Sequence, residues 1–220
     1  MSVAIRCQGL TRLFPNRVGS QPIVAVDNVD LELDIGEVLA IVGPSGCGKS
    51  TLLNLVGLLD RPTSGRVLVE DHDTATLDDA AAAAFRARMI GFVFQRYCLI
   101  EHLTVLENVK LAVQLAGDDR CESVAQVLEK VGLGDRMAAF PSTLSGGQAQ
   151  RAAVARALVK RPKVLLCDEP TGNLDGESAD RVMALLDAAR THCAVVIVTH
   201  DPAIAARADR TATMNAGALT

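Results

Sequence analysis

A glycine-rich loop between an apolar strand and an amphipathic helix places the strongest constraint on how this chain folds. The loop reads Gly43-Pro44-Ser45-Gly46-Cys47-Gly48-Lys49-Ser50-Thr51 and fits the pattern G-x-x-x-x-G-K-S/T. Before it, Val38 to Val42 form an unbroken apolar run, as in a buried parallel strand. After it, apolar residues recur at helical spacing and predict a helix from Lys49 to Leu59.

This strand, loop and helix together are typical of a phosphate-binding loop. In such loops the backbone N–H groups surround the phosphates, the lysine pairs with the outer phosphates, and the hydroxyl that follows it holds Mg²⁺. A glycine-rich turn before a core helix is the alternative, and the strand-loop-helix context disfavours it. We therefore expect residues 43–51 to bind a nucleotide, with Lys49 on its phosphates and Ser50 on the metal ion.

A second predicted strand ends in two adjacent carboxylates. Val164 to Cys167 are apolar, and Asp168 and Glu169 follow directly. Because successive strand side chains point to opposite faces, the two acids are expected to have different roles. Asp168 would reach Mg²⁺, and Glu169 would polarise the attacking water as a general base. A strand that merely ends in solvated acids would be the better interpretation without the phosphate loop upstream.

A second glycine-rich motif, Leu144-Ser145-Gly146-Gly147-Gln148, has the features of an anion-binding helix start. Ser145 can cap a helix expected from about Gly147 to Val159, and the glycines let its amides approach a γ-phosphate closely. Alone, such a sequence is usually just a helix cap. Together with residues 43–51 it makes the chain resemble the nucleotide-binding subunit of an ATP-binding cassette (ABC) transporter, whose signature motif has this sequence.

The resemblance covers nearly the whole chain and implies further roles in family order. It places Phe14 against adenine, Gln95 beside Mg²⁺ and the attacking water, and His200 on the γ-phosphate. Asn173 to Asp175 match the segment that crosses to the partner subunit. Each of these residues alone would more often be structural, and only the ordered set supports the assignments.

The resemblance thus implies a complete ATPase site shared between two chains. The expected catalytic residues are Glu169, His200 and Gln95. The expected metal ligands are Ser50, Gln95 and Asp168. The expected ATP contacts are Phe14, Gly43, Pro44, Ser45, Gly46, Cys47, Gly48, Lys49, Ser50, Thr51, Ser145, Gly146, Gly147, Gln148 and Asp175. In this family two cassettes pack head to tail, so a homodimer in the ATP state is expected, with ATP and Mg²⁺ as cofactors.

The expected fold is α/β, a P-loop NTPase of the ABC ATPase type with a mainly parallel sheet, an antiparallel β subdomain and an inserted helical subdomain. Polar and apolar residues alternate over the first 35 residues, which predicts antiparallel strands with one solvated face. Helical periodicity dominates from about residue 96 to 158, and strands and helices alternate again afterwards. With 220 residues and 49% hydrophobic content, we expect one domain over residues 1–220.

Composition limits the expected partners and location. The net charge of −4 gives no basic field for nucleic acid. No apolar run reaches the roughly 18 to 20 residues that span a bilayer, and residues 1–6 lack a signal-peptide core. We therefore expect a cytoplasmic chain, peripheral on the inner face of the cell membrane beside a separate permease. Six scattered cysteines predict reduced thiols rather than zinc or disulfides.

The segment Pro170 to Asp175, with Ile90 to Gln95 and Glu107-Asn108-Val109, resembles the lipoprotein-releasing, macrolide-exporting and cell-division group of cassettes. The implied function is an ATPase subunit that powers export, lipoprotein or lipid extrusion, or mechanotransmission. One alternative is a cell-division type cassette that signals without transport. Another is a soluble ABC ATPase, such as an iron-sulfur assembly type.

The permease is expected to dock near Gln95, where a nucleotide-sensing loop joins the helical region. The residues expected at this contact are Tyr97, Leu99, Ile100 and Leu103. Core packing of the same four side chains is an equally good interpretation of the sequence.

Overall fold

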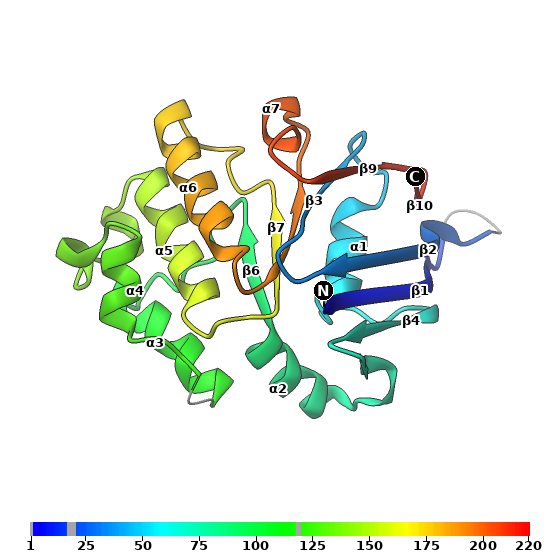
Figure 1. The fold of residues 1–220 in the computed structure, drawn as a ribbon, viewed down its shortest axis with the longest axis horizontal. Helices are drawn as coiled ribbons and strands as arrows, with labels where there is room; N and C mark the ends of the chain where they lie inside the picture. Colours follow the sequence, from blue (N-terminus) through cyan, green and yellow to red (C-terminus); the bar gives the residue numbers. More distant parts are fainter. Residues whose placement is uncertain (1, 17–20, 118–119) are drawn as a thin grey trace.

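The computed structural model describes residues 2–16, 21–117 and 120–220. Within these residues the chain forms a four-stranded sheet, order β2-β1-β4-β5, and a six-stranded sheet, order β10-β9-β3-β8-β7-β6 (Figure 1). The strands are β1 (Val3–Phe14), β2 (Ile23–Asp34), β3 (Val38–Val42), β4 (Ser64–Val69), β5 (His72–Asp73), β6 (Ile90–Phe94), β7 (Val164–Asp168), β8 (Ala194–Val198), β9 (Arg210–Asn215) and β10 (Ala218–Leu219). The helices are α1 (Lys49–Val56), α2 (Asp79–Met89), α3 (Val105–Ala116), α4 (Val124–Lys130), α5 (Gly146–Leu158), α6 (Gly176–Ala189) and α7 (Pro202–Ala205), with 3₁₀ turns η1 (Thr74–Thr76), η2 (Gly134–Arg136) and η3 (Pro141–Thr143).

The six-stranded sheet is parallel except for its last strand. β3 pairs in parallel with β8 and β9, and β7 pairs in parallel with β8 and β6, whereas β10 runs antiparallel to β9. β8 is buried along its whole length, as expected for a strand with both faces covered. Because parallel strands end at the same edge, the segments after β3, β6, β7 and β8 lie together there.

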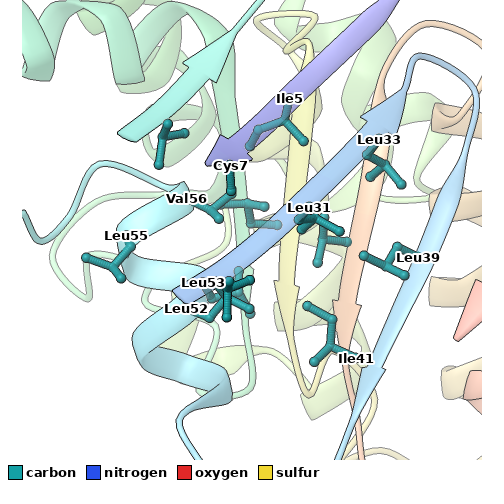
Figure 2. Packing of buried hydrophobic residues seen from close by; sticks show 14 of the residues in the cluster. Ile5, Cys7, Leu31, Leu33, Leu39, Ile41, Leu52, Leu53, Leu55 and Val56 are labelled. Atoms are coloured by element: carbon teal, nitrogen blue, oxygen red, sulfur yellow. The ribbon is translucent and has the colours of Figure 1, made fainter. Parts of the chain in front are cut away.

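The antiparallel sheet has one buried and one solvated face, as its alternating sequence predicts. In β2, Val29, Leu31 and Leu33 are buried, whereas the intervening Asp30 and Glu32 are exposed. Figure 2 shows how these leucines, with Ile5 and Cys7 of β1, face α1 and β3. The core that they form joins the two sheets and includes Cys47 of the loop between β3 and α1.

The helical region packs around α5. This helix contacts α3, α6 and strand β6, and in Figure 1 it lies between α6 and the pair α3 and α4. Its alanines allow this close packing, because Ala152, Ala153 and Ala155 are completely buried. A separate apolar cluster joins α5 to α3 and α4 through Val105, Val109 and Leu128 among others.

The structure confirms the expected architecture and corrects some element ends. The helix predicted over Lys49–Leu59 stops at Val56, because the chain turns at Gly57 and Leu58 adopts a left-handed φ of 56°. The alanine-rich stretch Ala80–Ala84 lies in α2, which Asp78 caps. In the part of the chain that the structure describes, no helix is long and apolar enough to cross a membrane.

Candidate nucleotide site

Loop 43–51 has a backbone that requires glycine at two positions. Gly43 and Gly48 adopt φ values of 154° and 111°. A Cβ on Gly43 would lie 2.2 Å from the carbonyl oxygen of Met214, and one on Gly48 would lie 2.0 Å from that of Ala25. The loop is therefore wedged between β2 and β9, directly before the N-terminus of α1.

Lys49 lies across this loop. Its Nζ donates to the carbonyl oxygens of Gly43 at 2.8 Å and Pro44 at 2.9 Å. The Sγ of Cys47, a buried thiol, lies 3.8 Å from the same nitrogen. The ammonium group thus stays at the centre of the loop, where a lysine of this motif meets phosphate oxygens.

Asp168 and Ser50 meet as the sequence predicts. The Ser50 hydroxyl donates to Asp168 Oδ2 at 3.0 Å. Burial raises the pKa of Asp168, and the Ser50 hydrogen bond opposes this effect. Desolvation disfavours the charged form of this half-buried carboxylate, and a nearby cation would stabilise that form.

These two oxygen donors fit a magnesium ion. Mg²⁺ prefers oxygen ligands and is usually held by one or two carboxylates, with substrate phosphates and water completing the octahedron. Among the described residues, no three His, Cys, Asp or Glu side chains gather into a metal cage. The donor set at Ser50 and Asp168 therefore fits an ion shared with a bound nucleotide.

Glu169 directly follows β7, lines the same cavity as Asp168 and contacts His200. The His200 Nδ1 lies 2.7 Å from Glu169 Oε1, and this hydrogen bond raises the pKa of His200. Glu169 has a left-handed φ of 47°, uncommon for a residue with a side chain. Such strain persists only where surrounding contacts enforce it, and it is concentrated at functional sites.

Gln95 follows β6 and meets the segment after Glu169. Its Nε2 donates to Asn173 Oδ1 at 3.4 Å, and Asn173 Nδ2 donates back to the Gln95 carbonyl oxygen at 3.3 Å. Gly172 lies beneath the amide, because a Cβ there would be 3.0 Å from Gln95 Nε2. Two loops from neighbouring strands are thus held together by paired amides.

These side chains surround one open cavity of about 450 Å³. Its lining consists of Ile23, Ala25, Ser45, Gly46, Gly48, Lys49, Ser50, Thr51, Gln95, Asp168, Glu169, Val198 and His200. Phe14, expected against adenine, does not contribute to this lining. The Arg12 guanidinium lies 4.6 Å from the Phe14 ring centroid and covers one face of the ring.

The signature residues lie outside the cavity, at the start of α5. Ser145 and Gln148 form a capping box, in which each side chain accepts a backbone N–H of the other residue. A Cβ on Gly146 would lie 2.8 Å from the Tyr97 hydroxyl, and one on Gly147 would lie 2.5 Å from Ser178 Oγ. Gly147 is therefore required by packing against α6, because Ser178 Cβ also lies 2.9 Å from this position, whereas the Gly146 contact involves only the far end of a side chain.

Asp175 caps α6 beside the signature. Its two carboxylate oxygens accept the backbone N–H and the hydroxyl of Ser178, each at 2.9 Å. These hydrogen bonds, the backbone one first, lower the pKa of Asp175. Asp175 and the signature serine thus occupy neighbouring helix N-termini on one surface, away from the cavity around Lys49.

The family profile described as ABC transporter matches residues 26–172. The chain belongs to the ABC transporter family. The profile covers the phosphate loop, the signature and the strand that ends at Asp168.

Two curated relatives and one solved structure resemble this cassette. The lipoprotein-releasing system ATP-binding protein LolD of Chromohalobacter salexigens is 44% identical over 223 residues, which cover 99% of this chain and 93% of LolD. The macrolide export ATP-binding/permease protein MacB 2 of Aeromonas hydrophila is 45% identical over 218 residues, and the match spans 97% of this chain but only 33% of MacB 2. The dimeric ATP-binding cassette MJ0796, in a post-hydrolysis state bound to ADP and Pi, is 37% identical with a TM-score of 0.88 and covers 98% of this chain and 96% of its own.

These comparisons confirm several predictions. The ABC cassette family, its resemblance to the lipoprotein-releasing and macrolide-exporting group, and the ABC ATPase fold are as expected. The expected enzyme class, an ATPase, is the class of this family. The roles of individual residues stay predictions.

Some residues around the site were not assigned from sequence. Ile23 and Ala25 line the cavity from β2, although nothing in an alternating strand distinguishes them. Arg156 of α5 donates to the carbonyl oxygens of Tyr97 and Cys98, and both of these residues have positive φ values. The only sequence signal for Arg156 is an arginine in the helix after the signature, among alanines.

Proposed function

We propose that this chain is the ATP-hydrolysing subunit of a membrane ABC complex of the export or lipoprotein-extrusion kind. The observation that carries this proposal is the convergence of Lys49, the Ser50–Asp168 pair and the Glu169–His200 pair on one cavity. A cation for phosphates, an oxygen site for Mg²⁺ and a carboxylate beside an imidazole are the parts that ATP hydrolysis needs.

In this proposal Lys49 exchanges the carbonyl oxygens of Gly43 and Pro44 for phosphate oxygens. Ser50 and Asp168 would hold Mg²⁺, and this ion would supply positive charge against the phosphates. Glu169 accepts a hydrogen bond from the attacking water and orients it, while His200 turns its imidazole toward the γ-phosphate. The His200 Nδ1–Glu169 Oε1 contact leaves Nε2 of the imidazole and the second carboxylate oxygen available for these roles.

The proposal includes a head-to-tail homodimer. Ser145, Gly146 and Asp175 lie outside the cavity of their own chain, so a second chain is needed to bring a signature to the bound ATP. The similar MJ0796 cassette is itself dimeric, which supports this arrangement. The ATP contact of Phe14 stays within the proposal as a contact at the outer edge of the site.

We place the membrane partner in a groove below Gln95. Two adjoining cavities of about 310 and 430 Å³ share Phe92 and Phe94 of β6, Leu115 of α3 and Lys160. Leu115 is 65% exposed there. By contrast, Leu99, expected at this contact, packs against the cluster of α3 and α4. A partner segment with an apolar face would cover Leu115.

An acidic group on this segment would complement the groove. Burial, followed by Arg156 and Arg86, lowers the pKa of Lys160 to about 8. A carboxylate placed in the groove would favour the charged amine again. Such docking would keep the cassette peripheral, on the cytoplasmic face of a permease. The proposal treats residues 1–220 as one domain and includes no nucleic acid partner.

Glu169→Gln tests the proposed function. The variant should bind ATP with unchanged affinity, lose turnover and accumulate as an ATP-bound dimer in gel filtration. Glu129→Gln, the same change at an exposed residue of α4, should behave as wild type. Wild-type turnover in Glu169→Gln would refute the base assignment. Lys49→Ala should instead weaken ATP binding itself, and unchanged binding would refute the role of the loop.

A further inference from the structure

Gln150 is a buried amide between the signature and the catalytic segment. It lies in the first turns of α5 and is 1% exposed. Its Nε2 donates to the carbonyl oxygen of Pro170 at 2.6 Å. Pro170 directly follows Glu169, so one hydrogen bond joins the signature helix to the residue after the proposed base.

The oxygen of this side-chain amide has no hydrogen-bond partner among the described residues. This atom, Oε1 of Gln150, is buried. An amide rotated by 180° would direct this oxygen at the Pro170 carbonyl oxygen, which repels it, so the donor must face Pro170. A buried acceptor without a partner costs free energy, and the carbonyl oxygen of the buried Pro170 would lose its donor if the amide were removed. The glutamine thus leaves its own oxygen unpaired while its N–H satisfies the backbone directly after Glu169.

The hydrogen bond acts where the backbone is strained. Glu169 keeps its φ of 47° between two other hydrogen bonds: its N–H donates to the Val198 carbonyl oxygen at 2.9 Å, and its carbonyl oxygen accepts from Gly172 N–H at 3.1 Å. The first of these hydrogen bonds is made with the edge of the sheet, and the second is made within the turn itself. The Gln150 contact is the one of the three that comes from α5.

We propose that Gln150 is a positioning residue for ATP hydrolysis, whose amide holds the Glu169–Pro170 backbone in the geometry that aims the Glu169 carboxylate at the attacking water. This inference rests on the proposed function, because it acts through Glu169 as base. Misplacement of a catalytic group by about 1 Å can reduce a rate on the order of 100-fold without weakening substrate binding.

Gln150→Met tests this inference, since it keeps the length and burial of the side chain and removes both the donor and the unpaired oxygen. We expect kcat, measured well below the melting temperature of the variant, to fall by about 10-fold to 100-fold, while KM for ATP stays at its wild-type value. Gln126→Met on α4, where the glutamine is exposed, is the matched control and should change neither kcat nor melting temperature.

Two results would overturn the inference. One is an unchanged kcat in Gln150→Met. The other is a fall in kcat that accompanies a similar fold-rise in KM for ATP, as general damage to the site predicts. If the methionine variant does not fold, Gln150→Leu, which also lacks the donor, is measured in its place with the same expectation.

A second measurement separates this inference from the proposed function. In a Glu169→Gln background, Gln150→Met should leave the ATP-trapped dimer intact, because the amide positions the base and not the signature. Loss of that dimer would show a damaged signature and would overturn the inference. Turnover by Glu169→Gln alone would instead refute the proposed function, whatever Gln150→Met does.

Discussion

Ser178 fills the space that a side chain on Gly147 would need. Its Oγ lies 2.5 Å, and its Cβ 2.9 Å, from the position of a Cβ on that glycine. Ser178 is itself fixed in α6 by the Asp175 carboxylate. The signature glycine is therefore required by a neighbouring helix of the same chain, before any nucleotide or second chain approaches it.

Gly147→Ala should destabilise the isolated chain for this reason. We expect overpacking to cost about 1 to 3 kcal/mol, measured by urea unfolding. Ser178→Gly, made in the same chain, should recover most of this loss, since it removes both contacting atoms. Gly176→Ala is the control, because a Cβ there meets nothing within 4 Å. An equal cost with and without Ser178 would contradict the steric explanation.

The contact between His200 and Glu169 predicts a pH-dependent effect. A carboxylate that accepts from Nδ1 favours the imidazolium form, so Glu169→Gln should lower the pKa of His200 toward its ordinary value. The stabilisation from this pair is complete below the unfolded-state pKa of about 6.5 and disappears as pH rises through the raised folded-state pKa. NMR titration measures the shift, with the other three of the 4 histidines as internal controls. An unchanged His200 pKa would contradict the contact.

Leu115→Glu should weaken docking of the membrane partner. Leu115 is 65% exposed, so the isolated chain should keep its stability and its basal ATPase rate. Co-purification of the tagged chain from its native membranes should recover several-fold less of the permease that the wild-type chain retains. Gln114→Glu adds the same charge one residue earlier and should retain the permease. Equal recovery of the permease with Leu115→Glu would show that the docking site lies elsewhere.

Cys47 predicts inhibition by thiol reagents. Its Sγ lies 3.8 Å from Lys49 Nζ, so a bulky maleimide on this sulfur would fill the space for phosphates. Because the thiol is 7% exposed, we expect slow inhibition of ATPase activity and protection by ATP. Cys47→Ser should be resistant, which separates this site from the exposed Cys98. Inhibition of Cys47→Ser at the wild-type rate would show that another cysteine reacts.

Much of the parallel sheet could be predicted because its strands leave local signals. Val38–Val42 and Ala194–Val198 are short apolar runs, and the ends of the strands carry the motifs. The loop and strand-end residues around Lys49 therefore came together as expected. Family order was needed for Gln95 and His200, because a single polar residue after a strand has no local signal of its own.

Contacts between distant segments could not be predicted. Asn108 is 1% exposed, accepts from the Ile100 N–H, and donates to the carbonyl oxygens of Ile100, Leu103 and Thr104. It thus shapes the loop that leads into α3. The sequence pattern shows only a helix with one polar residue among its apolar positions. Periodicity reports which face of a helix is buried, and it does not report which backbone groups a buried amide will meet.

The length of α5 has a consequence for how signals arrive at the site. This helix has 13 residues, about 20 Å of rigid rise, with the signature at one end and the groove residue Lys160 just beyond the other. Gln150 bonds the segment after Glu169 to this helix, and Arg156 bonds the segment after Gln95 to the same helix. A displacement of α5 at the groove would therefore reach the segment after Gln95 and the segment after Glu169 together, because both are bonded to this one helix.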